Sequence, residues 1–518
     1  MILGELFERN AACFGNRPCV WFEDRWRTHG EVTSRVRRLI NALAKLGGRK
    51  QDRLVVLARN CPEYLEVYGA AALGGFVGVG INYRLSLDEL ADIVRDAEPA
   101  FLFFEPEYAQ YARQLQSACP QTQLIAFGAV TDGALSYEAL LDAASDGPIA
   151  FRAVEEDTLY LVYTSGTTGK PKGVMLGNGS VAHQTFVLSG THCAEPTDRM
   201  LIVMPFYHMG APAESFAYLA TGAAIVMHRA FDVEEAMRSI ESQRVTAALL
   251  APTMIQMLLD APARNRFDLT TLQTICYASA PMSVALLRRA HAAFGPIFMQ
   301  VYGMSELGLG CAMAKFQHVF DGSPAEVKRL ASAGQPFLGT QIRIVDDSDA
   351  PCPSGTVGNI LIRSTATVMQ GYWRQPERTK EAIRSDGFLV TGDVGYLDED
   401  SFLFIVDRKK DMIISGGENI YSREVEDAIA MHPAVAEVAV IGAPHPKWGE
   451  TVVAVIVLNK GMRVSEDELN DHVRAHIASY KKPSIYRFID RLPRVSSTNK
   501  VDKRALREPF WAGHERQV

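Results

Sequence analysis

The chain has 518 residues, more than one hydrophobic core normally serves, so two or more domains are expected. Hydrophobic residues make up 47% of the sequence and charged residues 22%, which excludes a globally disordered protein. The net charge of −7, from 53 basic and 60 acidic residues, gives no reason to expect nucleic acid or an anionic membrane as a partner.

The first part of the chain carries no targeting or membrane-spanning signal. Met1 leads into charged residues rather than a sustained apolar run, so no signal peptide is expected. Residues 35–46 predict a helix whose three arginines face water and whose end is marked by two glycines. Residues 68–81 are apolar, but the stretch is rich in glycine and too short to cross a bilayer, so it predicts buried core and no integral membrane span.

The cysteines are scattered and form no CxxC pair. Their positions are 13, 19, 61, 119, 193, 276, 311 and 352. This pattern predicts reduced thiols and a cytoplasmic location, and neither a disulfide framework nor a zinc site.

Apolar, unalternated runs recur through the middle of the chain and predict buried strands. They cover residues 159–164, 200–205, 223–228, 246–252, 272–278 and 297–303. Helical patterns lie between several of them: Asp232 is expected to cap one helix, and a second is expected from Ser283 to Gly295. Alternating buried strands and helices favour an α/β fold of helix-covered, mostly parallel sheets.

The pattern of apolar runs and turn residues changes twice towards the C-terminus. Residues 340–346, 358–364 and 402–408 are short, turn-bounded strands that predict a β-barrel-like portion. The charged run "DRKKD" then predicts an exposed connector, followed by a compact α+β unit. We therefore expect an N-terminal domain at 1–407, a hinge at 408–411 and a small mobile C-terminal domain at 412–518.

The stretch "YTSGTTGKPKGV", residues 163–174, directly follows a predicted buried strand. Glycine-freed backbone N–H groups, hydroxyls and lysines make such a loop complementary to phosphate oxygens. It is not a Walker A loop, because only Thr167 and Thr168 separate Gly166 from Gly169 and Pro171 follows Lys170. A flexible surface linker is the alternative, but it would not normally follow a buried strand.

This stretch resembles, almost position for position, the signature of the adenylate-forming (AMP-binding) enzymes: acyl- and aryl-CoA synthetases, peptide-synthetase adenylation domains and luciferases. The chain is most similar to the acid–CoA ligases among them. The resemblance implies that the loop binds the β- and γ-phosphates of ATP. Its expected ATP-binding residues are Thr164, Ser165, Gly166, Thr167, Thr168, Gly169, Lys170 and Lys172, with Thr164 also in a catalytic role.

A second stretch, "QVYGMSE", resembles the nucleotide element of the same family. Tyr302 beside Gly303 is suited to stack on adenine, and Met304 lies next to them. Ser305 is suited to the α-phosphate, and Glu306 is a hard oxygen ligand for Mg²⁺ with a catalytic role. The resemblance also places Ser279 and Ala280 at the nucleotide, although "YASAPMS" departs from the usual glycine pair through Ala278 and Ser279.

The stretch from 388 to 421 resembles the family's segment around the hinge. By that resemblance Asp393 binds the ribose hydroxyls, Arg408 assists it and Lys410 is the hinge residue. The "SGGENIY" loop is expected to bind coenzyme A through Ser415, Gly416 and Gly417, because glycines leave room for a pantetheine arm. Trp448 is grouped with these CoA-binding residues.

Near the end, "LPRVSSTNKVDKRAL" resembles the loop that carries the family's adenylation lysine, here Lys500. Asn499 stands where glycine is common, and the spacing from Pro493 is one residue longer than usual. Asn tolerates a left-handed turn conformation, so the substitution is acceptable. Lys503 is the competing candidate.

The acid-binding region is expected around "MPFYHMGAP". It has no carboxylate to pair with an α-amine, so an amino-acid substrate is disfavoured. A small or apolar pocket suits a fatty, alicyclic or aromatic acid. Its expected residues are His208, which also has a catalytic gating role, Met209, Met254, Ala278 and Met304.

The resemblance thus implies ATP-dependent activation of a carboxylic acid to an acyl-adenylate, with release of pyrophosphate. Thioester formation with CoA would follow, giving acyl-CoA and AMP. No carrier-protein domain is evident in the sequence, so CoA is the expected acceptor. A stand-alone enzyme that loads the acyl group onto a separate acyl carrier protein is the alternative. A catalytically silent binding protein is a third reading, disfavoured by the presence of Glu306, Asp393, Arg408 and Lys500. A homodimer stays open as the assembly state.

Overall fold

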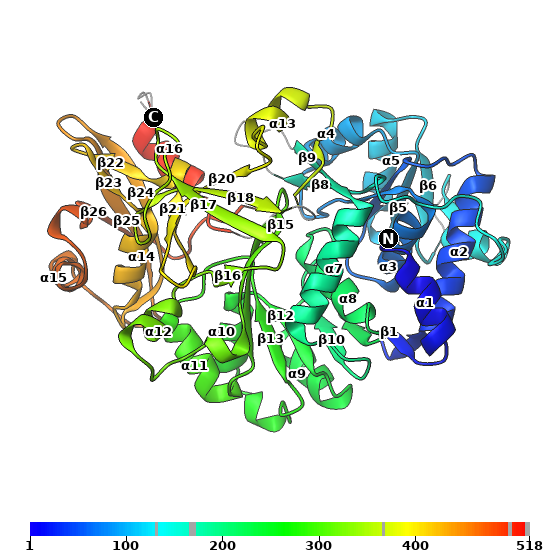
Figure 1. Cartoon of the computed structure of the whole chain (residues 1–518), viewed down its shortest axis with the longest axis horizontal. Coiled ribbons are helices and arrows are strands. Elements are labelled where there is room, and N and C mark those ends of the chain that lie inside the picture. The colour runs from blue at the N-terminus through cyan, green and yellow to red at the C-terminus, as the bar shows by residue number, and fades with distance from the viewer. Residues whose placement is uncertain (130–132, 165–171, 365–367, 496–499, 513–518) are drawn as a thin grey trace. The chain divides into compact units, whose positions relative to one another are not determined.

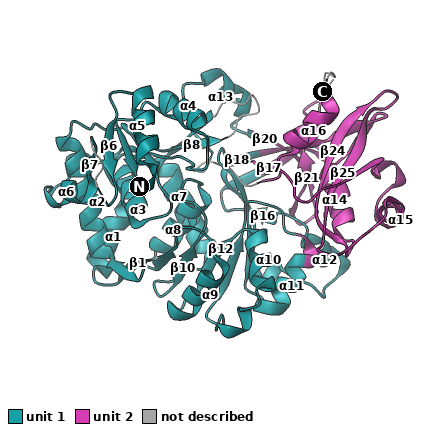
Figure 2. Ribbon diagram, turned by 180° about the vertical axis from the view of Figure 1, so that it is seen from behind, with its two compact units in different colours: residues 1–282, 286–341, 362–389 teal, residues 283–285, 342–361, 390–518 magenta. Residues whose placement is uncertain are grey.

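The computed structural model describes residues 1–129, 133–164, 172–364, 368–495 and 500–512. The chain divides into two compact units, shown in teal and magenta in Figure 2. Unit 1 comprises Met1–Met282, Leu286–Gln341 and Ile362–Leu389. Unit 2 comprises Ser283–Ala285, Ile342–Leu361 and Val390–Val518. The predicted hinge at 408–411 lies inside unit 2 and stays a prediction about motion.

Unit 1 contains a nine-stranded sheet in the order β16-β15-β14-β13-β12-β10-β11-β1-β2. The five central strands pair in parallel, as their unalternated apolar sequences predict. The strands are β1 (Pro18–Phe22), β2 (Arg25–Thr28), β10 (Arg199–Ile202), β11 (Ala224–Met227), β12 (Ala247–Leu250), β13 (Thr274–Tyr277), β14 (Phe298–Met304), β15 (Gly308–Met313) and β16 (Gln335–Pro336).

The second sheet of unit 1 has eight strands in the order β19-β9-β8-β4-β3-β5-β6-β7. The strands are β3 (Arg53–Leu57), β4 (Val77–Gly80), β5 (Phe101–Phe104), β6 (Gln123–Ala126), β7 (Leu135–Ser136), β8 (Thr158–Thr164), β9 (Lys172–Gly177) and β19 (Gly371–Tyr372). The apolar stretch at 68–81 contributes to buried core, as predicted, with Val77, Val79 and Ile81 in one cluster.

Helices separate and cover the two sheets (Figure 1). The α7–α8 pair lies between them, because α7 contacts β8 and β9 while α8 contacts β10 and β11. The helices of unit 1 are α1 (Glu5–Phe14), α2 (His29–Lys45), α3 (Pro62–Gly74), α4 (Leu87–Ala97), α5 (Ala109–Ala118), α6 (Tyr137–Asp142), α7 (Asn178–His192), α8 (Gly210–Leu219), α9 (Val233–Ser242), α10 (Pro252–Asp260), α11 (Val284–Phe294, which begins in unit 2), α12 (Pro324–Arg329) and α13 (Pro376–Ala382), with short 3₁₀ turns η1 (Pro106–Tyr108), η2 (Arg264–Arg266) and η3 (Lys315–Gln317).

Two predicted helices are confirmed with informative differences. Asp232 caps α9, accepting a hydrogen bond from the Glu235 amide at 2.9 Å. The helix expected at 35–46 is α2, which starts earlier, at a capping box formed by Thr28 and Glu31. Its arginines do not simply face water: Arg35 binds Glu138, and the Arg37 and Arg38 guanidinium groups donate to carbonyl groups of α6 and of the segment after it.

Unit 2 contains most of a four-stranded sheet, in the order β17-β18-β20-β21, which the short C-terminal runs predicted. A five-stranded sheet follows in the order β23-β22-β25-β24, with β26 paired to β25. The strands are β17 (Thr340–Val345), β18 (Gly358–Ser364), β20 (Leu389–Leu397), β21 (Leu403–Arg408), β22 (Ile413–Ser415), β23 (Glu418–Ile420), β24 (Val435–His445), β25 (Gly449–Leu458) and β26 (Ile485–Phe488).

The helices of unit 2 pack on the five-stranded sheet. They are α14 (Ser422–Ala430), α15 (Glu466–His476) and α16 (Lys503–Trp511), with 3₁₀ turns η4 (Lys409–Asp411) and η5 (Ser479–Lys481). Alternate residues of β24 and β25 enter two separate clusters, with Val440 in one and Ile441 in the other. Both faces of this sheet are therefore buried, as its continuous apolar strands require. Among the described helices of both units, none is long and apolar enough to cross a membrane.

Candidate active site

The predicted phosphate loop joins the two strands of an antiparallel hairpin, β8 and β9. Thr164 ends β8 and Lys172 begins β9, and the two residues are paired in register. The Oγ1 atom of Thr164 is buried and has no hydrogen-bond partner among the described residues. An unpaired buried hydroxyl at the base of this loop is available for an external acceptor such as a phosphate oxygen. The expected ligands Ser165, Gly166, Thr167, Thr168, Gly169 and Lys170 lie outside the described residues.

The predicted nucleotide element forms a second hairpin, between β14 and β15 of the other sheet. Tyr302 pairs with Cys311 across this hairpin, and a Cβ atom at Gly303 would collide with the Gly308 carbonyl. Glycine is therefore required at 303 by the closeness of the returning strand. Glu306 lies in the turn, where its carbonyl accepts a hydrogen bond from the Met369 amide at 2.9 Å.

Three side chains that are distant in sequence meet beside these hairpins: Lys172, Glu306 and Tyr372. The Lys172 Nζ atom lies 3.0 Å from Glu306 Oε1 and donates to the Tyr372 hydroxyl at 2.7 Å. That hydroxyl donates to the same Oε1 atom at 3.0 Å. Among the described residues no hydrogen bond is made to Oε2. These contacts to the carboxyl group are thus on Oε1, and Oε2 can accept a further bond.

The surroundings of this cluster favour a charged lysine. Burial opposes the charge on Lys172, but the Tyr372 hydroxyl and the Glu306 carboxylate outweigh it and raise the pKa of the lysine. Burial and the nearby Glu306 charge raise the pKa of Tyr372, so its hydroxyl stays protonated as a donor. The sequence analysis missed Tyr372, because a Gly-Tyr pair about 200 residues from the loop carries no signal of its own. Only the pairing of β19 with β9 reveals it.

The expected acid-binding residues gather at the ends of elements that meet in unit 1. His208 precedes α8 in a turn closed by its amide on the Pro205 carbonyl at 3.1 Å, and Met209 caps that helix. Ala278 directly follows β13, Met254 lies on α10 and Met304 ends β14. Ala278 leads into Ser279 and Ala280, which are exposed.

Ser279 has a φ of 72°, in the left-handed region that favours glycine. A non-glycine residue held there stores backbone strain, and such strain is found preferentially where a ligand contacts the chain. The left-handed φ explains why glycine is usual at this position in the family. In this chain Ser279 stands there instead.

In unit 2 the expected ribose-binding and adenylation residues lie close together. Asp393 and Arg408 are cross-strand partners of β20 and β21, with Arg408 Nε 3.2 Å from Asp393 Oδ1. Asp393 is buried, while Arg408 is exposed. Lys500 is an exposed residue, yet desolvation of its ammonium lowers its pKa, the Arg408 charge adds to the shift and Asp393 opposes it. The three residues therefore form one electrostatic group.

The competing lysine, Lys503, is occupied elsewhere. Its Nζ atom lies 2.7 Å from Glu426 and donates to the Ser422 hydroxyl at 2.6 Å. These contacts hold α16 against α14 and give Lys503 a structural role. The predicted hinge residue, Lys410, is exposed in the turn η4.

The predicted CoA-binding residues converge at one edge of the five-stranded sheet. Ser415 pairs with Gly449, and the Gly416 amide donates to the Trp448 carbonyl at 2.8 Å. Gly416 and Gly417 have φ values of 62° and 85°, and a Cβ atom at Gly416 would lie 2.9 Å from the Trp448 ring. Glycine is required there for both conformation and space. Trp448 remains 47% exposed, with the Lys447 ammonium 4.4 Å from its ring centroid.

Comparison with known proteins identifies the family of the chain. The family model described as AMP-binding enzyme matches residues 7–373, and the AMP-binding enzyme C-terminal domain matches residues 424–499. A feruloyl-CoA synthase of Amycolatopsis sp is 37% identical over 485 residues, covering 93% of this chain and 94% of that protein. An indoleacetate–CoA ligase of Aromatoleum aromaticum is 34% identical over 511 residues, covering 98% of each. The solved structure of the amide bond synthetase McbA from Marinactinospora thermotolerans is 29% identical with a TM-score of 0.89, covering 98% of this chain and 100% of that one.

Proposed function

The chain belongs to the AMP-binding enzyme family, and from that premise we propose that it converts an aromatic carboxylic acid into its CoA thioester. It is an AMP-forming acid–thiol ligase that works by ATP-dependent adenylation and then thioester formation. That the substrate is an aromatic acid is the more specific part of the proposal. It is supported by the names of two relatives and by the small and flexible side chains expected around the acid.

The arrangement of Glu306 is the observation that carries the proposal. The substrate carboxylate and the ATP phosphates are both negatively charged and repel each other. The carboxylate can therefore displace pyrophosphate only if the phosphate charge is neutralised. Lys172 is held charged at the base of the phosphate loop, and Glu306 is fixed through Oε1 with Oε2 unused by described residues. Bound at Glu306, Mg²⁺ would supply further positive charge to the phosphate oxygens.

In the first half-reaction a substrate carboxylate oxygen attacks the α-phosphorus of ATP, and the bond to the β-phosphate oxygen breaks. Thr164 and Lys172 bind the departing phosphates, Tyr302 stacks on the base and Asp393 with Arg408 binds the ribose. Lys500 stabilises the charge that develops at the reacting oxygens. In the second half-reaction the CoA sulfur attacks the acyl carbon, AMP leaves and the thiol proton is released. Gly416, Gly417 and Trp448 flank the incoming thiol arm.

The test measures pyrophosphate release across a panel of aromatic, alicyclic and fatty acids, with CoA, with a phosphopantetheinylated carrier protein, or with neither. Acid-dependent release with thioester formation on free CoA is expected. Thioester formation on the carrier alone would replace the proposal by the carrier-loading alternative, and release with no acid would overturn it.

A pair of lysine variants tests the assignment of Lys500. Lys500→Ala should reduce adenylation by about 100- to 1000-fold while supplied acyl-adenylate is still converted to the thioester. Lys503→Ala is the matched control; it should lower thermal stability through loss of the Glu426 ion pair and leave adenylation by the folded enzyme intact. Loss of adenylation in Lys503→Ala with retention in Lys500→Ala would assign the catalytic role to Lys503 instead.

A further inference from the structure

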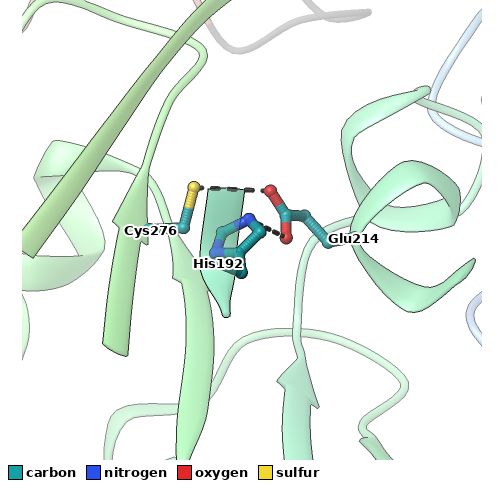
Figure 3. A group of neighbouring side chains, drawn as sticks. All are labelled: His192, Glu214 and Cys276. Carbon is teal, nitrogen blue, oxygen red and sulfur yellow. Dashed lines mark hydrogen bonds and ion pairs between the residues drawn. The ribbon is translucent and has the colours of Figure 1, made fainter. Parts of the chain in front are cut away.

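A buried polar cluster lies in unit 1, apart from the residues assigned above (Figure 3). It consists of His192 at the end of α7, Glu214 on α8 and Cys276 on β13. Their exposed fractions are 4%, 3% and 0%. The Cys276 thiol donates to Glu214 Oε1 at 3.4 Å, and His192 Nε2 lies 2.9 Å from Oε2.

The cluster is close-packed but poorly hydrogen-bonded. His192 Nε2 and Glu214 Oε2 are near each other, yet their geometry is not that of a hydrogen bond, so both atoms lack a hydrogen-bond partner among the described residues. The same holds for His192 Nδ1. A thiol is a weak donor, so the one hydrogen bond that Glu214 accepts is a weak one. A buried carboxyl group left in this state is costly, which suggests that a further donor meets it.

Two members of the cluster lie on the same elements as expected acid-binding residues, α8 after His208 and Met209, and β13 before Ala278. Gly210 and Glu214 are four residues apart on α8, so they share one face, with Glu214 one turn, about 5.4 Å, deeper. Gly210 is exposed, whereas Glu214 is buried. On the facing strand Cys276 is two residues before Ala278, which is the same side of an extended chain.

Gly210 leaves room beside α8 at this level. A Cβ atom at Gly210 would have a single neighbour within 4 Å, Leu249 Cδ2, at 3.7 Å, and so would meet only ordinary contact. Position 210, one turn before Glu214 on the same face, therefore carries no side chain and has space beside it. A flat group that enters past His208 and Ala278 would point its far edge at the Glu214 carboxyl.

We propose that Glu214 is a specificity-determining residue that accepts a hydrogen bond from an O–H or N–H group at the far end of an aromatic acid. The inference rests on the proposed function, because it takes the acid to bind between His208 and Ala278. The Cys276 thiol lies beside one carboxyl oxygen of Glu214 and His192 lies beside the other. A site built to accept such a bond rejects an acid that lacks the donor, because the buried oxygen is then left unpaired.

A bound transition metal is the other occupant that these three residue types suit, since their ligand atoms all lie within 4.8 Å of one another. A metal would need the cysteine as thiolate, whereas burial raises the pKa of the Cys276 thiol well above its usual range and the neighbouring Glu214 adds to the shift. The space beside Gly210, one turn from Glu214 and next to the expected acid-binding residues His208 and Met209, favours the substrate donor.

The experiment compares matched acids on the wild-type enzyme: 4-hydroxycinnamic with cinnamic acid, and indole-3-acetic with naphthalene-1-acetic acid. We expect kcat/KM for pyrophosphate release to favour the donor-bearing member of at least one pair by 10-fold or more. Equal values in both pairs would overturn the inference while leaving the proposed function intact. No release with any acid would overturn both.

Variants test whether the preference comes from Glu214. Glu214→Leu should abolish it by lowering kcat/KM for the donor-bearing acid with little change for its partner, and Glu214→Gln, which keeps an acceptor oxygen, should retain part of it. Glu234→Gln on the exposed face of α9 is the control and should change nothing. A preference that survives Glu214→Leu would contradict the assignment.

Two further measurements test the proposal without substituting Glu214 and test whether the cluster binds a metal. Gly210→Val leaves Glu214 in place but fills the space above it, so it should depress activity with both cinnamic acids more than with short aliphatic acids. Equal activity of this variant with both kinds of acid would argue against the route past Gly210. Stoichiometric zinc in purified wild-type protein, lost in Cys276→Ser, would assign the cluster to a metal instead.

Discussion

Two buried carboxyl groups of unit 1, Glu66 and Glu306, differ in how completely their oxygens are used. Glu66, on α3, is fully buried; its Oε1 accepts from Arg27 at 2.8 Å and Arg35 at 2.7 Å, and its Oε2 accepts from Tyr137 at 2.7 Å. Glu306 receives both of its contacts on Oε1.

We propose that the difference separates a structural carboxylate, Glu66, from one that binds a ligand, Glu306. Both oxygens of Glu66 are satisfied within the protein, so it joins α2, α3 and α6 and needs nothing further. Glu306 is oriented by Lys172 and Tyr372 through Oε1, and the described residues make no hydrogen bond to Oε2, which agrees with the metal-binding role proposed for it. Glu214 has partners near both oxygens but only one weak hydrogen bond, which places it with Glu306 rather than with Glu66.

The largest effect is expected from substituting Glu66, the structural carboxylate of the two. Glu66→Gln should lower the free energy of unfolding by about 3 kcal/mol, because it leaves Arg27 and Arg35 half-buried with one carboxylate partner fewer each. The activity per folded molecule should be unchanged. Thermal unfolding and pyrophosphate release measure the two quantities, and a variant as stable as the wild type would remove the basis of the comparison.

The same substitution at the other carboxylate should reverse the pattern. Glu306→Gln should reduce adenylation by about 100- to 1000-fold, because the ligand to Mg²⁺ and to the phosphate charge is lost. Its melting temperature should fall less than that of Glu66→Gln, which serves as the matched control. Equal stability losses with retained activity would make Glu306 a structural residue like Glu66.

Removing one hydroxyl group sharpens the comparison further. Tyr372→Phe deletes the donor that orients Glu306 Oε1 and binds Lys172, while the ring and its contact with the lysine remain. The Mg²⁺ concentration at half-maximal adenylation should rise about 10-fold, with a smaller change in kcat at saturating Mg²⁺. Tyr480→Phe, at an exposed tyrosine, is the control. A lowered kcat with an unchanged Mg²⁺ requirement would argue against a positioning role.

The smallest expected effect concerns acid sensitivity of the Glu66 region. The Arg35 guanidinium, through its hydrogen bond, lowers the pKa of Glu138 from its usual 4.5. A lowered folded-state pKa stabilises the protein above about pH 4.5, and this contribution is lost as the pH falls through the folded-state value. Glu138 is 48% exposed, so the effect should be below about 1 kcal/mol. Stability curves of Glu138→Gln and wild type should converge at low pH; parallel curves would contradict the prediction.

The sequence predicted the class of reaction, the fold class and several of the strands and helices. The apolar runs at 159–164 and 297–303 are strands β8 and β14, and the glycine pattern between 163 and 174 indicated the phosphate loop. These features are encoded by neighbouring residues, where periodicity and turn chemistry act locally. The water-facing role assigned to Arg35 was wrong, because its partner, Glu138, lies 103 residues away.

The sequence by itself therefore determined the family and the strand-and-helix alternation, and it supplied the residues that we propose for the adenylating site. Only the tertiary structure brought Tyr372 between Lys172 and Glu306 and placed His192, Glu214 and Cys276 in one buried group. The physical reason is that a side chain acquires its electrostatic surroundings from segments packed across sheets and helices. Whether a buried carboxyl group is satisfied or left with an unused oxygen depends on that packing, and no local pattern records it.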